Sequence, residues 1–394
     1  KKADLIRIAN IYLENLEHPE KSIETWKRVQ EAFGESDETV DALVGSYEAA
    51  GRIDEMVDLL ERASAQYTTR VTHRLMMLGN ACRDHLDAPQ RALTAYKKAL
   101  LHDSRHEGAR EGLKGLLEVE SCIGEAAEAL VISYRENEEW AQVVSLVDAR
   151  LRASEDPRVH LQVLKEAASL EEQKLDNKEN AFKYLAAAFP LEPTNTLTED
   201  HLVELAETTE QWPAAVEALR KGIEALKDDP HAEVHLRFRE AEILETKLQE
   251  NENAFAAYLK VFEIQQDHRQ ATGGIVRLGA RLGRWEEVAH TVVSHTLAIN
   301  DLVMALIDEM ESVAAESEAF DALAPALEKA MDGAENMPPH LGFEVYYRIA
   351  KWHRDKLEQP VAAEETLLKA VACDGNRADA LRDLAELQRA HPGR

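Results

Sequence analysis

The sequence predicts an all-α protein, a solenoid of stacked antiparallel helical hairpins with about 22 helices of three to four turns each. Three observations predict it. Apolar residues recur every three or four positions along nearly the whole chain, which is the period of one helix face. Alternating β-branched runs, typical of strands, are nearly absent. A step of thirteen residues between two small side chains recurs five times.

The thirteen-residue pairs mark one type of hairpin. Two helices cross closely only where both side chains are small, so each pair indicates a crossing point. The five pairs are Ala9 and Ser22, Gly79 and Ala92, Ala168 and Ala181, Ala241 and Ala254, and Ala350 and Ala363.

The first hairpin shows the elements of this type in order. An apolar stripe runs from Leu5 to Leu16, a polar break covers residues 17–19, and a second stripe runs from Ile23 to Val29. Leucines at 86, 175, 248 and 357 precede equivalent breaks. We therefore expect the same turn to end the first helix in all five hairpins.

A second hairpin type alternates with the first. Its second helix opens at Gly51-Arg52-Ile53, Glu139-Trp140, Gln211-Trp212 and Arg284-Trp285, with apolar residues at the third and seventh following positions. Regular spacing favours tryptophans that close the mouth of the hairpin by core packing, although exposed ligand anchors stay an alternative.

One continuous solenoid over residues 1–394 is the predicted domain organisation, because no Gly/Ser-rich tether interrupts the periodic pattern. Two segments are irregular. Near 105–121, residues 107–119 predict a helix without an obvious partner. Near 300–340 the pattern predicts a divergent hairpin followed by a loop at Met337-Pro338-Pro339. That hairpin carries Leu302, Leu306, Met310, Leu323 and Leu327.

Composition narrows the function classes. The formal net charge is −28, which argues against nucleic acid and anionic membrane surfaces as partners. The acidity is spread along the chain, so a solvated surface is favoured over an acidic groove for a basic peptide. Three scattered cysteines indicate no disulfide framework, and no apolar run is long enough to span a membrane. The missing signal slightly favours the cytoplasm, but the chain begins at Lys1 and is expected to be an excerpt or processed product.

The hairpins resemble the tetratricopeptide repeat (TPR) family, whose repeats of about 34 residues place a small residue in each helix and an aromatic residue one turn later. Ala92, Tyr96 and Ala99 match its second-helix positions. The segment with Ala181, Ala188 and Pro193 matches them with Leu185 in the aromatic position. The chain departs from the family in its thirteen-residue step, its missing first-helix Trp and its mostly replaced terminal Pro. It is also similar to the long repeat proteins of some bacteria.

The resemblance implies a right-handed superhelix whose first helices line a concave groove. It points to the residue after each small residue and to the residue three further on. Paired Asn10 and Asn80 would clamp a peptide backbone, and Arg83, Lys351 and Arg354 would meet a carboxylate. The first set is Asn10, Asn80, Ser169, Glu242 and Lys351, and the second is Leu13, Arg83, Glu172, Glu245 and Arg354. Ordinary solvated helix residues are the alternative for all ten.

No catalytic or cofactor motif is evident. Gly273-Gly274 lies in a helical pattern rather than a phosphate loop, and Cys82 lies on a packed stripe. The pairs His102 and His106, and His231 and His235, have helical i,i+4 spacing but lack a third ligand and straddle expected helix starts. We therefore expect no enzyme activity, no cofactor and no metal site.

Two functions stay open. The first is a non-catalytic scaffold that binds a protein or peptide in the concave groove. The alternative is a sensor or regulatory module that closes on a small molecule or signalling peptide at one of the irregular segments. The end of the chain, with Leu384, Leu387 and His391-Pro392-Gly393-Arg394, carries no distinct polar capping helix, so weak end-to-end self-association is expected.

Overall fold

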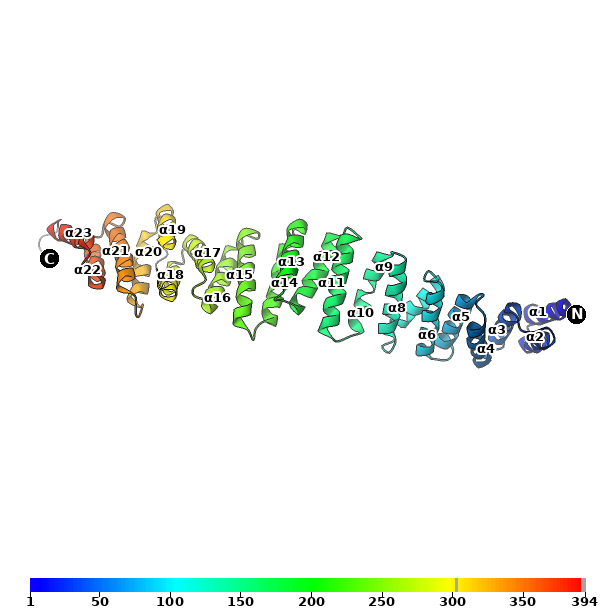
Figure 1. Cartoon of the computed structure of the whole chain (residues 1–394). Helices are drawn as coiled ribbons and strands as arrows, with labels where there is room; N and C mark the ends of the chain where they lie inside the picture. Colours follow the sequence, from blue (N-terminus) through cyan, green and yellow to red (C-terminus); the bar gives the residue numbers. More distant parts are fainter. Residues whose placement is uncertain (302–303, 391–394) are drawn as a thin grey trace. The chain divides into compact units, whose positions relative to one another are not determined.

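A computed structural model describes residues 1–301 and 304–390 of the chain. This part contains 23 α-helices, one short 3-10 helix and no strand (Figure 1). Helices α9 (Trp140–Ser145) and α10 (Val147–Arg152) abut at Leu146, so they form one interrupted helix. The predicted all-α class and the predicted number of helices are therefore confirmed.

Contacts between Cα atoms divide the chain into two units, and each is described by itself. Unit 1 covers Lys1–Ala188, and unit 2 covers Phe189–Arg394. The prediction of one continuous solenoid stays a prediction. Besides α9 and α10, unit 1 contains α1 (Lys2–Glu14), α2 (Pro19–Phe33), α3 (Asp37–Ala49), α4 (Ile53–Gln66), α5 (Val71–Asp84), α6 (Pro89–His102), α7 (Glu107–Leu116), α8 (Ile123–Glu136), α11 (Pro157–Gln173) and α12 (Lys178–Ala188). Unit 2 contains η1 (Phe189–Leu191), α13 (Thr196–Thr209), α14 (Trp212–Ala225), α15 (Pro230–Thr246), α16 (Asn251–Ile264), α17 (Arg269–Arg281), α18 (Trp285–Ile299), α19 (Met304–Glu316), α20 (Phe320–Asp332), α21 (Pro339–Asp355), α22 (Pro360–Cys373) and α23 (Ala378–Ala390).

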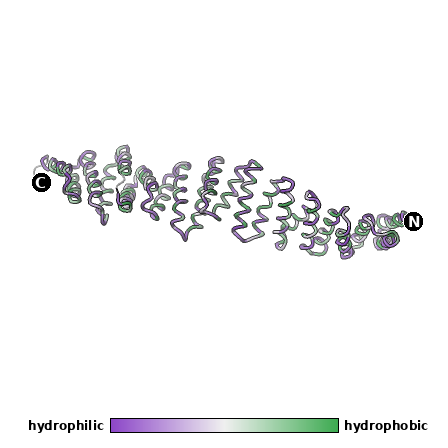
Figure 2. Tube along the Cα trace, in the orientation of Figure 1, coloured by the Kyte–Doolittle hydropathy of each residue, from purple (hydrophilic) through white to green (hydrophobic). Residues whose placement is uncertain are grey.

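The five hairpins with thirteen-residue pairs are α1/α2, α5/α6, α11/α12, α15/α16 and α21/α22. Among the described helices these five pairs make the most extensive contacts. All ten small residues of the pairs are buried. Polar and apolar residues alternate along the helices (Figure 2), as expected for hairpins that bury one stripe each. The five predicted hairpins are confirmed, and their small residues are buried as a close helix crossing requires.

One turn closes all five of these hairpins. The residue after each break leucine has a left-handed backbone, for example Glu17 with φ 49° and Asp87 with φ 47°. The next amide donates to the carbonyl six residues back at 2.8–2.9 Å, which is one residue longer than the long bond of a Schellman motif. These bonds are His18 to Tyr12, Ala88 to Cys82, Asn177 to Glu171, Glu250 to Leu244 and Gln359 to His353.

A shorter turn closes the hairpins of the second type, which are α3/α4, α8/α9, α13/α14, α17/α18 and α19/α20. A left-handed residue again precedes the second helix, but the next amide donates to the carbonyl five residues back at 2.8–3.2 Å. The bonds are Arg52 to Tyr47, Glu139 to Tyr134, Gln211 to Ala206, Arg284 to Gly279 and Ala319 to Ala314. The extra residue predicted for the first type therefore lies in its connection, where the first helix ends one residue earlier.

The alternation of the two types fails at both predicted irregular segments. Helix α7 lies between the hairpins α5/α6 and α8/α9 and packs against α5, α6 and α8, so it does have partners. Its helix ends at Leu116 rather than Val119. In unit 2, α17/α18 is followed directly by a second short-turn hairpin, α19/α20. Of the residues expected there, Leu306, Met310, Leu323 and Leu327 are buried, and Leu302 lies outside the described residues.

Two tyrosine rings pack closely against glycines of the helix that follows their own hairpin. A Cβ added at Gly112 of α7 would lie 2.3 Å from the Tyr96 ring, and one added at Gly79 of α5 would lie 2.4 Å from it. The Tyr96 ring of α6 is thus enclosed by the backbones of both helices. Tyr258 of α16 lies in the same way against Gly274 of α17, at 2.6 Å from an added Cβ. Only glycine permits these approaches.

One tryptophan of the second type lies in the core, and the other two lie at its edge. Trp285 is buried, whereas Trp140 and Trp212 are half-buried. The Nζ atom of Lys174 lies 5.5 Å from the Trp140 ring centroid, and that of Lys247 lies 4.8 Å from the Trp212 centroid. Each lysine caps the first helix of the next thirteen-residue hairpin. The aromatic residue therefore joins successive hairpins through a cation–π contact.

Candidate functional site

The ten groove positions predicted from the TPR resemblance share one environment. All of them are half-buried, and they lie on α1, α5, α11, α15 and α21. Neighbours on one helix, such as Asn80 and Arg83, lie one turn apart. Among the described residues, the hydrogen bonds and ion pairs of Asn80, Arg83, Glu242, Glu245 and Arg354 join none of these five to a candidate on another helix.

The candidates in α5 are engaged within the chain. Asn80 accepts the Tyr96 hydroxyl hydrogen bond through Oδ1 at 2.7 Å, and its amide nitrogen lies 3.1 Å from the Met76 sulfur. Arg83 forms a two-bond ion pair with Asp84 at 2.6 and 2.9 Å. A ligand would have to displace these partners before the side chains could bind it.

The candidates in α15 and α21 are engaged in similar ways. Glu245 accepts hydrogen bonds from Tyr258 and Arg277 at 2.7–2.9 Å. Burial opposes the charge of Glu245, but the bonds from Arg277 and Tyr258 outweigh it and lower its pKa. Arg354 pairs with Asp355 and, at 3.1 Å, with Asp383 of α23. Two looser contacts remain: Glu242 lies 3.7 Å from Arg239, and the Lys351 Nζ lies 4.3 Å from the Tyr347 ring centroid.

Ion pairs between consecutive first helices account for the engagement of Glu245 and recur in both units. Four times, an arginine on the later first helix reaches a carboxylate on the earlier one. These pairs are Arg74 with Asp41 at 2.8 Å, Arg239 with Glu199 at 3.6 Å, Arg277 with Glu245 at 2.7 Å, and Arg348 with Asp308 at 2.6 Å. Much of the charge on this face is therefore used to join repeats.

The histidine pairs serve local roles. His106 caps α7, where its Nδ1 accepts from the Ala109 amide at 3.1 Å, and His235 lies 2.8 Å from Glu199. Burial raises the pKa of Glu199, against the opposing effect of His235. The described residues contain no group of three or more His, Cys, Asp or Glu side chains placed to hold a metal ion. In the same part of the chain, no helix is long and apolar enough to cross a membrane.

Clefts open instead along α2, α4, α6 and α8 of unit 1. One lies between α2 and α4, a second between α4 and α6, a third between α6 and α8, and a fourth among α8, α10 and α11. Each shares a lining residue with the next: Glu61, Leu101 and Glu128 in turn. Neighbouring clefts in this series therefore adjoin one another at a shared wall residue.

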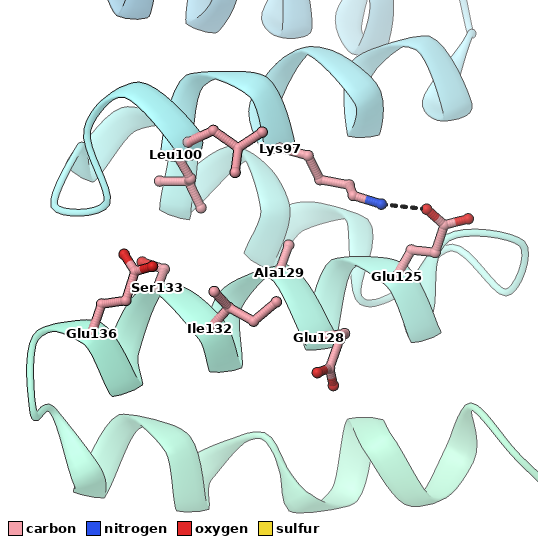
Figure 3. Close-up of a pocket in the computed structure, with 9 residues that line it drawn as sticks. Lys97, Leu100, Glu125, Glu128, Ala129, Ile132, Ser133 and Glu136 are labelled. Carbon is pink, nitrogen blue, oxygen red and sulfur yellow. Dashed lines mark hydrogen bonds and ion pairs between the residues drawn. The ribbon is translucent and has the colours of Figure 1, made fainter.

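The cleft between α6 and α8 has an apolar centre. It has a volume of about 260 Å³ and is lined by Leu100 and Leu101 of α6 and by Ala129 and Ile132 of α8 (Figure 3). Leu101 is 84% exposed and Ile132 is 50% exposed. Large apolar side chains this exposed and this close together mark an interaction surface more often than isolated ones do.

Polar groups border this apolar centre. Lys97 pairs with Glu125 at 2.6 Å at one end, and Glu128 and Glu136 add two exposed carboxylates along α8 (Figure 3). Ser133 on the floor already donates to the Ser104 carbonyl at 2.6 Å and accepts from Arg110 at 2.8 Å. The floor is thus suited to an apolar side chain rather than to a hydrogen-bonding one.

Sequence reasoning missed Leu101 and Ile132. Both lie beside a buried apolar residue, Leu100 and Val131, and on the side of the helix that faces solvent. An apolar residue outside the periodic stripe of an amphipathic helix was the available signal. It becomes informative only when both helices are known to border the same cleft.

No protein-family model and no curated protein matches this sequence. Among solved structures, the chain is similar to Naa15/Naa10 bound to HypK-THB, with 14% identity, a TM-score of 0.31, and coverage of 99% of this chain and 61% of that one. It is also similar to the TPR2AB-domain–pHSP90 complex of yeast Sti1, with 13% identity, a TM-score of 0.29, and coverage of 66% and 98%. The P58(IPK) TPR domain is similar as well, with 13% identity, a TM-score of 0.26, and coverage of 98% of this chain and 97% of that one. These TM-scores are low, so the assignment of helical hairpins rests on the helices and contacts of this chain.

Proposed function

We propose that this protein is a non-catalytic scaffold that binds a protein or peptide partner. One observation carries the proposal: Leu101 and Ile132 expose large apolar surfaces around a single cleft between two packed helices. A helical-hairpin array offers long surfaces of this kind, which suit a peptide or an amphipathic helix.

The first-helix face expected to form a concave groove is a second contact surface in this proposal. Asn10, Asn80 and Lys351 are half-buried there, so part of each side chain is open to a partner. Because several neighbouring charges are paired within the chain, this face contributes less to affinity than an open charged groove would. The predicted similarity to bacterial long-repeat proteins and the weak end-to-end association stay predictions. Light scattering at high concentration tests the association.

A sensor that closes on a small molecule is the second candidate. The cleft between α6 and α8 adjoins the irregular segment at 105–121, which is where such a pocket was expected. Its volume of about 260 Å³ is below the range of about 300–1,000 Å³ typical of ligand sites. One or two apolar side chains of a peptide fit this volume better than a whole ligand.

Site-specific photo-crosslinking tests the scaffold. A photoreactive amino acid is placed at position 101, at positions 80 and 351 on first helices, and at position 197 as a control. Leu197 is suited to the control because it is a similarly exposed leucine, 79% exposed, in unit 2. The scaffold predicts discrete protein adducts at position 101 that an excess of unlabelled protein competes away. If none of positions 101, 80 and 351 yields an adduct above the level at position 197, the proposed function is wrong.

A further inference from the structure

We infer that the cleft between α6 and α8 binds an amphipathic helix whose apolar anchor is flanked by basic residues. This inference rests on the proposed function and names the chemistry of the partner. Its place in the molecule also differs from the groove positions expected from the TPR resemblance, since none of those ten positions lies on α6 or α8.

The apolar centre selects the anchor. Leu101 and Ile132 border the opening, while Leu100 and Ala129 line it more deeply. Because the Ser133 hydroxyl is already hydrogen-bonded within the chain, a polar anchor would gain no partner on the floor and would lose its water. A leucine or isoleucine side chain satisfies this site best.

The charged residues around the cleft favour a basic partner. Three carboxylates and one ammonium line the cleft, and the ammonium of Lys97 is paired with Glu125. No hydrogen bond or ion pair is recorded for Glu128 or Glu136 among the described residues, and both are exposed. A basic partner would therefore gain two new ion pairs, whereas an acidic partner would meet like charge.

The spacing of Glu128 and Glu136 along α8 favours a helical partner. Glu128, Ile132 and Glu136 follow one another at four-residue intervals along one stripe of α8. The backbone positions of the two glutamates are therefore separated by about 12 Å along the helix axis. A partner helix aligned with α8 would match them with basic residues about eight positions apart and would place its anchor between them.

A designed peptide tests this chemistry. The probe is a synthetic helix of about 18 residues with two leucines four positions apart, bracketed by lysines eight positions apart. Two control peptides carry glutamates in place of the lysines or serines in place of the leucines. Fluorescence anisotropy measures their binding to the full chain. We expect the lysine peptide to bind at least about tenfold more tightly than either control.

Variants of the full chain locate the site. Leu101→Ser and Ile132→Ser should each weaken binding of the lysine peptide by about tenfold, because each removes exposed apolar surface that the peptide would cover. The double variant Glu128→Lys/Glu136→Lys should prefer the glutamate peptide instead. Leu197→Ser is the matched control and should leave binding unchanged. Circular dichroism checks that each variant retains its helices.

Several outcomes would overturn the inference. If the lysine and glutamate peptides bind equally well, the partner is not selected for basic residues. If Leu101→Ser binds the lysine peptide as tightly as the parent chain does, the peptide does not bind in this cleft. Self-association in sedimentation experiments that Leu101→Ser abolishes would show that a second copy occupies the cleft. Photo-adducts at positions 80 and 351 but not at position 101 would leave the scaffold standing and reject this site.

Discussion

Tyr96 in unit 1 and Tyr258 in unit 2 occupy equivalent positions, four residues after the small residue of a second helix. Their rings pack in the same way, but their hydroxyl groups bond to different kinds of acceptor. Both rings pack against a glycine sixteen residues further along the chain, Gly112 or Gly274. The Tyr96 hydroxyl donates to the neutral amide of Asn80 at 2.7 Å, whereas the Tyr258 hydroxyl donates to Glu245 at 2.9 Å.

The comparison separates what the fold demands from what it permits. Close packing of the ring needs glycine in both units, because any Cβ would enter the space of the ring. The polar end needs only an acceptor. Burial raises the pKa of Tyr96 to about 12, so its hydroxyl stays a donor at neutral pH. In unit 2 the acceptor also pairs with Arg277 and so adds a charge network.

The largest expected effect is on the glycines. Gly112→Ala should lower the free energy of unfolding by about 2–3 kcal/mol and Gly274→Ala by about 1–2 kcal/mol, because overpacking forces the ring to move. Gly112 costs more since the Tyr96 ring also lies against Gly79 and has less room to shift. Urea denaturation followed by circular dichroism measures both.

Gly273→Ala is the matched control for the glycine variants. It lies beside Gly274 in α17, but no atom lies within 4 Å of an added Cβ. Alanine should therefore raise the free energy of unfolding by about 0.5–1 kcal/mol through its higher helix propensity. Equal destabilisation by Gly273→Ala and Gly274→Ala would contradict the tyrosine–glycine packing.

Removing each hydroxyl tests the polar ends. Tyr258→Phe deletes a hydrogen bond to a charged carboxylate and should cost about 1.5–3 kcal/mol, whereas Tyr96→Phe deletes a bond to a neutral amide and should cost about 0.5–1.5 kcal/mol. Thermal unfolding of both variants under one buffer condition provides the measurement. A larger loss for Tyr96→Phe would reverse the comparison.

Acid should distinguish the two units in the same way. Hydrogen bonds from Arg277 and Tyr258 overcome the effect of burial and lower the pKa of Glu245 below its usual 4.5. Its contribution to stability is thus present above the unfolded-state pKa and is lost as pH falls through the folded-state pKa. Glu245→Gln should destabilise the chain at pH 7 and approach the parent below about pH 3. Asn80→Ala, at the neutral counterpart, should cost the same at both pH values.

The smallest expected effect concerns the lysines over tryptophan. Lys174→Ala in unit 1 removes a cation–π contact with Trp140 and should cost about 0.5 kcal/mol. Lys247→Ala in unit 2 removes the contact with Trp212 and also an ion pair with Glu207 at 2.6 Å, so it should cost a few tenths more. Added salt should reduce the difference between the two variants; a difference that persists at high salt would assign it to packing.

The regular part of this fold could be read from the sequence because its causes are local. Small residues thirteen positions apart, a leucine before each break and an apolar stripe all act within one hairpin. The candidate site could not be read in the same way. Whether Arg277 reaches Glu245, or whether Leu101 and Ile132 border one cleft, depends on how separate hairpins are placed against each other.

The two connection lengths have a consequence for building new arrays from these parts. In hairpins of the first type, the first helix ends one residue earlier, relative to the left-handed residue of the turn, than in hairpins of the second type. One residue corresponds to about 100° of rotation around a helix. Grafting a loop from one type into the other would therefore turn the leading helix's buried stripe away from its mate. Connections should be interchangeable among hairpins of one type, whereas an exchange between the two types should transfer the whole hairpin.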